Sequence, residues 1–197
     1  MGFAHCLGAI TVGVAGSAVL FAGPATAAGS DTPSAPAGDS RLAGPGVDLS
    51  VSIPTGWHQI SDTADPQLLQ MVFPYNCSEK LRCATAMARL LSTQAANAQA
   101  AAQAGEQAVA GQQGIEGVTA TSEGPLQIAG RNGYQIRFSF SSGKAKFQAA
   151  TAAVETGLAS AGTVPTSLIF VTVSDLAGAP PASVIDQIVG SAQLTAK

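Results

Sequence analysis

The chain has 197 residues, a length that fits one domain with or without tails. Nine Lys and Arg stand against twelve Asp and Glu, and the resulting net charge of −3 excludes the basic footprint of a nucleic-acid-binding protein. Charged residues make up only 11% of the chain and hydrophobic residues 46%, which excludes a highly charged disordered protein. Three cysteines are too few for a disulfide-dense miniprotein.

Residues 1–28 are predicted to be a cleaved signal peptide. The uncharged apolar run at 7–21 is shorter than the roughly 20 residues that a helix needs to cross a bilayer. An A-x-A pattern of small residues then places cleavage after Ala27 or Ala28. An uncleaved anchor is the alternative, since the first residues contain no Lys or Arg. Cys6 precedes the apolar run instead of following it, so lipidation there is not expected and the chain is predicted to be secreted without a stable membrane span.

The mature chain is predicted to consist of a linker and one domain. Residues 29–46 are dominated by Pro, Gly, Ser and Ala and are expected to be disordered, because they offer nothing that could form a core. Residues 47–197 then form the single folded domain. Cys77 and Cys83 lie within it and are expected to form a structural disulfide in an oxidising compartment. A redox-active pair or a metal site is the alternative.

Hydrophobic periodicity predicts several strands in this domain. Apolar and polar residues alternate at 47–53 and, most clearly, at 134–140, as in half-buried strands. The continuous apolar run at 166–174 indicates a strand buried on both faces. The remaining predicted strands are 69–75, 84–91 and 118–129, the last with a turn at 123–125. Arg131-Asn132-Gly133 is predicted to be a hairpin turn, because Asn-Gly tolerates positive φ angles.

Two helices are predicted among these strands. Residues 93–110 are nearly all Ala and Gln, which favour helix. A last helix is expected to start at Pro181 or Ala182, with an apolar stripe at helical spacing. That stripe consists of Val184, Ile185, Ile188 and Val189. Residues 145–158 fit a helix or a strand. The pattern as a whole predicts an α+β domain in which helices pack on a sheet.

No catalytic or metal-binding constellation is expected. His58 is the one histidine beyond the signal peptide, and no G-x-S-x-G elbow is present to place a serine beside it. Zinc needs three or four ligands, more than one His and a bridged Cys pair can supply. Asp62 and Asp65 are expected to cap a turn and not to bind a cation. We therefore predict no enzyme activity, no metal and no cofactor.

Four residues are candidates for a binding surface: Trp57, His58, Tyr75 and Tyr134. Trp and Tyr are enriched at interfaces, but they also anchor cores. Trp57 follows a Pro-Thr-Gly turn, and core packing is the favoured interpretation, with a position at the mouth of a groove as the alternative. Tyr75 and Tyr134 have the same two interpretations, and His58 is interpreted as a turn residue at the domain edge.

Three segments together resemble a known family. They are VSIPTGW near the start of the domain, NGYQIRFSF in its middle and SLIFVTVSDLAGAPP before the last helix. The chain resembles the PsbP-like superfamily and, within it, mycobacterial secreted proteins and lipoproteins of the LpqN/LpqT type, over roughly residues 47–195. The resemblance implies an antiparallel sheet flanked by helices and favours a strand at 145–155. The lipobox cysteine of those lipoproteins is missing here, which favours free secretion.

Two functions follow as expectations. The resemblance implies a non-enzymatic adaptor or binding protein of the actinobacterial cell envelope or extracellular space, with a protein partner. The alternative is a carrier of an apolar envelope lipid or glycolipid, in which the helix at 93–110 would move off the sheet to open a cleft. A hydrolase would need His58 close to a serine and an acid, which the sequence gives little reason to expect. The sequence leaves the identity of the partner and the oligomeric state open.

Overall fold

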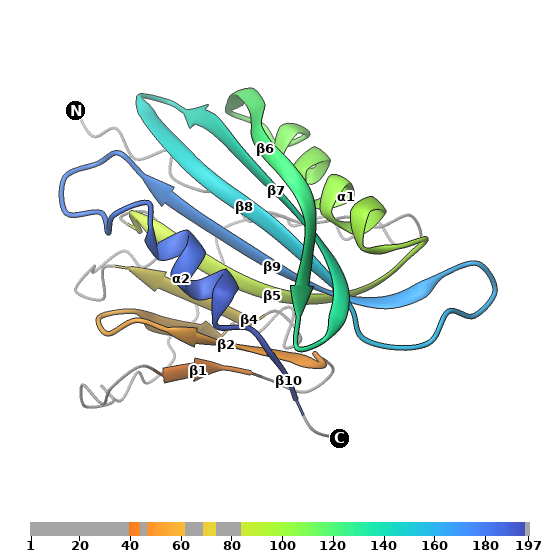
Figure 1. The fold of residues 1–197 in the computed structure, drawn as a ribbon. Coiled ribbons are helices and arrows are strands. Elements are labelled where there is room, and N and C mark those ends of the chain that lie inside the picture. The colour runs from red at the N-terminus through yellow and green to blue at the C-terminus, as the bar shows by residue number, and fades with distance from the viewer. Residues whose placement is uncertain (1–39, 44–46, 62–68, 74–83, 196–197) are drawn as a thin grey trace.

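In the part of the chain that the structure describes, two antiparallel sheets and two helices build the fold (Figure 1). The computed structural model describes residues 40–43, 47–61, 69–73 and 84–195. Its large sheet has seven strands in the order β3-β4-β5-β9-β8-β7-β6, and its small sheet has the order β1-β2-β10. The strands are β1 (Ser40–Leu42), β2 (Leu49–Ile53), β3 (His58–Ser61), β4 (Leu69–Phe73), β5 (Ala86–Ala95), β6 (Ile115–Ile128), β7 (Arg131–Ser142), β8 (Ala145–Glu155), β9 (Val164–Ser174) and β10 (Gln193–Leu194), and the helices are α1 (Ala98–Ala110) and α2 (Val184–Gly190).

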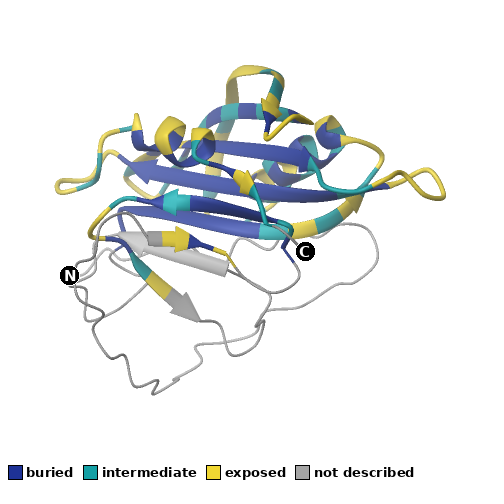
Figure 2. Ribbon diagram, turned by 60° about the horizontal axis from the view of Figure 1, so that its bottom comes forward, coloured by how far each residue is buried: buried dark blue, intermediate teal, exposed yellow. Residues whose placement is uncertain are grey.

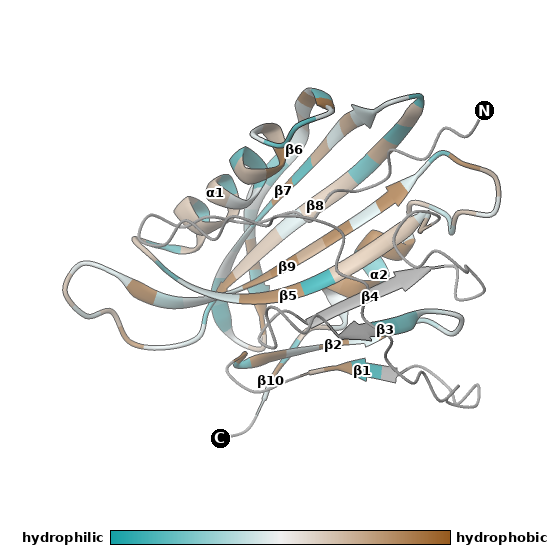
Figure 3. Ribbon diagram, turned by 180° about the vertical axis from the view of Figure 1, so that it is seen from behind, coloured by the Kyte–Doolittle hydropathy of each residue, from teal (hydrophilic) through white to brown (hydrophobic). Residues whose placement is uncertain are grey.

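The central strands of the large sheet are buried on both faces, as the dark blue strands of Figure 2 show. Because side chains alternate across a strand, neighbouring residues of β9 enter different cores. Ile169 and Val171 pack with α2 and the small sheet, whereas Leu168 and Phe170 pack with α1. In Figure 3, β9 is largely hydrophobic, and β5 beside it carries one hydrophilic segment between hydrophobic ones. The prediction of an α+β domain with helices on an antiparallel sheet is confirmed.

Helix α1 begins five residues later than its composition predicts. Residues 93–95 complete β5, where Thr93 pairs with Thr166 of β9, so sheet pairing prevails there over the local preference for helix. Asn97 then starts the helix, because its side-chain oxygen accepts a hydrogen bond of 2.8 Å from the Ala100 N–H. The helix ends at Ala110, and Gly111 follows it as predicted.

The predicted hairpin turn at 131–133 is wrong. The turn consists of Ala129 and Gly130, whose φ angles are 50° and 74°, and β7 already begins at Arg131. Gly133 instead permits close packing of strands, since a Cβ atom there would lie 2.8 Å from the Ala153 carbonyl oxygen of β8.

The predicted break in β6 at 123–125 is also wrong, because the strand runs through all three residues. Pro125 is tolerated since β6 is the edge strand of the large sheet, where an N–H group can be missing. The residues Gly124 and Pro125 therefore indicate an edge strand here and not the end of a strand.

The ambiguous segment 145–158 forms β8 as far as Glu155, which confirms the strand that the family resemblance favours. Both neighbours of β8 in the sheet are long strands, and their pairing prevails over the helix preference of its alanines. Helix α2 starts at Val184, after a turn, and its predicted apolar stripe is buried. Strand β1 lies within residues 29–46, which composition assigns to a linker. It pairs with β2, and its Leu42 is 1% exposed.

Candidate functional site

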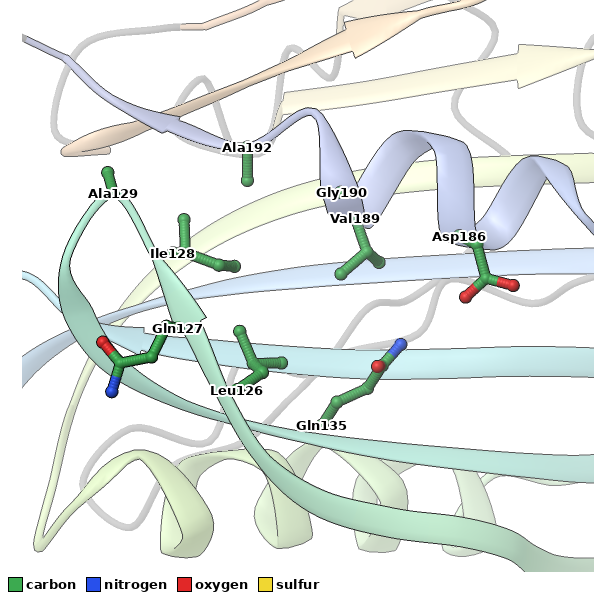
Figure 4. Close-up of a pocket in the computed structure, with 9 residues that line it drawn as sticks. All are labelled: Leu126, Gln127, Ile128, Ala129, Gln135, Asp186, Val189, Gly190 and Ala192. Carbon is green, nitrogen blue, oxygen red and sulfur yellow. The ribbon is translucent and has the colours of Figure 1, made fainter.

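A pocket of about 270 Å³ lies between the β6–β7 hairpin and α2 (Figure 4). Leu126 and Ile128 project from β6 toward α2, while Gln127, between them, points the other way. Val189 of α2 and Ala192, just beyond the helix, form the opposite wall. Strand alternation on one side and helical spacing on the other therefore turn four apolar side chains toward the same space.

The polar groups of the pocket carry little net charge. The Arg137 side chain of β7 donates to the Asp186 carboxylate of α2 and so forms an ion pair. Gln135 reaches from β7 toward α2, and its Nε2 atom is buried without a hydrogen-bond acceptor in the described part of the chain. The Gln135 amide and the Asp186 carboxylate, which Arg137 neutralises, can orient a ligand through hydrogen bonds. Because Asp186 is already paired, these groups offer no opposite charge to a strongly charged ligand.

Glycines keep the rim of the pocket open. Gly190, the last residue of α2, lines the pocket and is exposed, and a Cβ atom placed on it would meet no atom within 4 Å. Gly124 lies opposite Gln135 across the β6–β7 pair and likewise has open space beside it. Of these two glycines, Gly190 lines the pocket, so a larger side chain there can be accommodated without a clash at the Cβ atom and tests access to the pocket.

The structure separates the candidate binding residues of the sequence analysis. Trp57 is 8% exposed and belongs to the core that packs against α2. His58 is the first residue of β3 and is half-buried, and Tyr134 lies half-buried on β7 against the α1 core. Three residues of the sequence analysis lie outside the described residues: Tyr75, Cys77 and Cys83.

Tyr134 interacts with an acid on the edge strand. Its phenolic pKa is raised above the usual value, first by burial and then by the negative charge of Glu123 and a hydrogen bond to it. The phenol therefore stays neutral at physiological pH and can donate to the carboxylate. Tyr134 points to the α1 face of β7 and Gln135 to the α2 face, so this pair lies across the sheet from the pocket.

Sequence reasoning missed the pocket although it predicted parts of its walls. The strand predicted at 118–129 contains Leu126 and Ile128, and the predicted apolar stripe contains Val189. Nothing in the local sequence indicates that the hairpin and the last helix approach each other. Gln135 is a polar residue in an alternating strand, a pattern that predicts exposure to solvent. The sequence therefore did not indicate that it lies beneath α2.

The described residues offer neither a metal site nor a membrane-spanning helix. Within the ranges that the structure describes, His, Cys, Asp and Glu form no group of three or more that could hold a metal ion. Neither of the described helices has the length and hydropathy needed to cross a membrane.

Comparisons with known proteins identify the fold. No family model and no curated protein matches this sequence. A Bacteroides thetaiotaomicron protein of known structure is similar at a TM-score of 0.47 and 13% identity, over 81% of this chain, and this chain spans about half (49%) of its length. LpqN, involved in cell envelope biogenesis of Mycobacterium tuberculosis, has a TM-score of 0.48 and 11% identity over 80% of this chain and 91% of its own.

The third structure is the cyanobacterial PsbP protein, CyanoP, from Synechocystis. It is similar at a TM-score of 0.51 and 11% identity, over 85% of this chain and 99% of CyanoP. The match therefore includes nearly the whole of CyanoP. This protein has a PsbP-like α+β fold.

Proposed function

We propose that this chain is a secreted, non-enzymatic binding protein of the bacterial cell envelope or extracellular space, which holds a protein partner at the pocket between the β6–β7 hairpin and α2. The pocket carries the proposal: it combines apolar walls from Leu126, Ile128 and Val189 with a hydrogen-bonding amide from Gln135. Such a combination is typical of ligand-binding pockets. The predicted signal peptide and the family resemblance support the location.

The size of the pocket favours a protein partner over a lipid cargo. The pocket volume of about 270 Å³ lies just below the roughly 300–1,000 Å³ that is usual for small-molecule sites. This volume accommodates one or two side chains of a partner. Helix α1, which would have to move for a lipid cleft to open, packs closely on β8: a Cβ atom at Gly105 would lie 2.6 Å from Thr151 Cγ2.

Cross-linking in the producing bacterium, followed by reconstitution, tests this function. The captured partner is purified, and its binding to the mature chain is measured by calorimetry. We expect saturable binding that Gly190→Leu weakens at least tenfold, because the larger side chain at this lining position obstructs access to the pocket. Gln187→Leu is the matched control, since it adds the same side chain to an exposed position of α2 that does not line the pocket. Equal binding by all three proteins, or no saturable binding at all, would refute the proposal.

A further inference from the structure

From the edge strand beside the pocket, we propose that the partner segment is an extended peptide that adds to the end of β6 and inserts one uncharged apolar side chain into the pocket. This inference rests on the proposed function and specifies how the partner is held. It combines two features of the described residues: free backbone groups on an edge strand, and a pocket directly beside them.

The hairpin geometry fixes which backbone groups of β6 face outward. Ala129 and Gly130, both with positive φ, form a two-residue loop closed by the pair Ile128 and Arg131. In such a hairpin the closing pair exchanges both backbone hydrogen bonds, and the pairs then alternate along the strands. The backbone N–H and C=O of Gln127 therefore point away from β7, toward the open edge.

The rest of β6 is protected against strand addition. Pro125 occupies the next outward-facing position and lacks an N–H group. Register irregularities interrupt the ladder between Glu116 and Thr119 and again between Ala120 and Ser122. Proline, bulges and charges are the devices by which edge strands avoid pairing with other chains. The segment 126–128 lacks all three, and it is the segment that lines the pocket.

The side-chain chemistry of the pocket selects the inserted residue. A strand added beside β6 places alternate side chains on the α2 face, where Leu126 and Ile128 also lie. The nearby charges are already paired as Arg137 and Asp186, so a charged side chain would find no partner. An aliphatic residue such as leucine fits these walls. Backbone pairing combined with a pocket for one side chain is an established mode of peptide recognition.

The test uses a defined probe, the capped pentapeptide acetyl-Ser-Thr-Leu-Thr-Ser-amide, and two-dimensional amide NMR of the isotope-labelled mature chain. We expect saturable shifts at the end of β6, in β7 and in α2. The peptide with Ala in place of Leu is expected to bind at least tenfold more weakly, because it buries three fewer carbon atoms. Gly190→Leu is expected to remove binding, and Gln187→Leu to keep it.

Backbone pairing is tested separately from side-chain insertion. Gln127→Pro removes the outward N–H and is expected to weaken binding at least fivefold, whereas Gln127→Ala keeps that group and is expected to bind like the native chain. A peptide N-methylated at the two threonines gives the same readout without altering the protein, in case Gln127→Pro does not fold. Equal binding of the Leu and Ala peptides refutes the insertion.

Two further outcomes also overturn the inference. N-acetyl-leucinamide binding as tightly as the pentapeptide would show a small-molecule site, and binding that Gln127→Pro and N-methylation leave unchanged would show insertion without strand addition. If the reconstituted partner binds while the pentapeptide does not, and Gln127→Pro leaves partner binding intact, the proposed function stands and this inference alone fails.

Discussion

The contact of α1 with β8 at Gly105 is a strong constraint on the position of the helix. A Cβ atom on Gly105 would lie 2.6 Å from Cγ2 and 3.2 Å from Oγ1 of Thr151. Thr151 is 1% exposed, so its side chain has little room to turn away. Its Oγ1 atom has no hydrogen-bond partner in the described part of the chain. The helix therefore approaches the sheet at a distance that only glycine permits.

We predict that Gly105→Ala lowers the free energy of unfolding although alanine favours helix. The higher helix propensity contributes about 1 kcal/mol in favour of the variant. Overpacking against Thr151 opposes it with about 1–3 kcal/mol, so the net change ranges from near zero to a loss of ~2 kcal/mol. In a Thr151→Ala background the nearest remaining atom is the Cβ of residue 151 at 3.5 Å, an ordinary contact. There Gly105→Ala is expected to stabilise by about 1 kcal/mol.

Urea unfolding of the four proteins of this double-mutant cycle measures the coupling. Fluorescence of Trp57 reports the transition, since it is the chain's one tryptophan and is buried in the core. Gln107→Gly, at an exposed position of α1, calibrates helix propensity without a packing change. A Gly105→Ala effect that is the same in both backgrounds would refute this account of the packing, and α1 would then have room to move on the sheet.

Three further predictions concern the cap, a strand contact and the pH response. Asn97→Ala is expected to lower the free energy of unfolding by about 1 kcal/mol in urea melts, because an N-cap bond is lost. Gly133→Ala is expected to lower it by at least ~1–3 kcal/mol, since the backbone oxygen of Ala153 cannot turn away. The raised pKa of Tyr134 means that the folded state keeps its proton longer than the unfolded state, so stability falls as the pH rises above about 10. Glu123→Gln is expected to lower that pKa in an ultraviolet titration, and an unchanged titration would contradict the assigned interaction.

Local sequence determined most of the elements but not all of their limits. Alternation at 134–140 and the continuous apolar run at 166–174 correctly predicted β7 and β9, because strand period and burial are encoded residue by residue. Turn signals were less reliable. Asn132-Gly133 resembles a hairpin turn, yet those residues lie in β7, and Gly133 is present because another strand passes close to it.

The sequence by itself determined the α+β class, the burial of the α2 stripe and the positions of β7 and β9, since hydrophobic pattern alone selects which face of each element is buried. Only the tertiary structure decided that residues 145–155 form a strand, because pairing with both neighbours prevails over the helix preference of alanine. It also decided where the pocket lies. Leu126 and Val189 are far apart in the chain, and their shared space exists because the hairpin and the last helix fold onto the same face of the sheet.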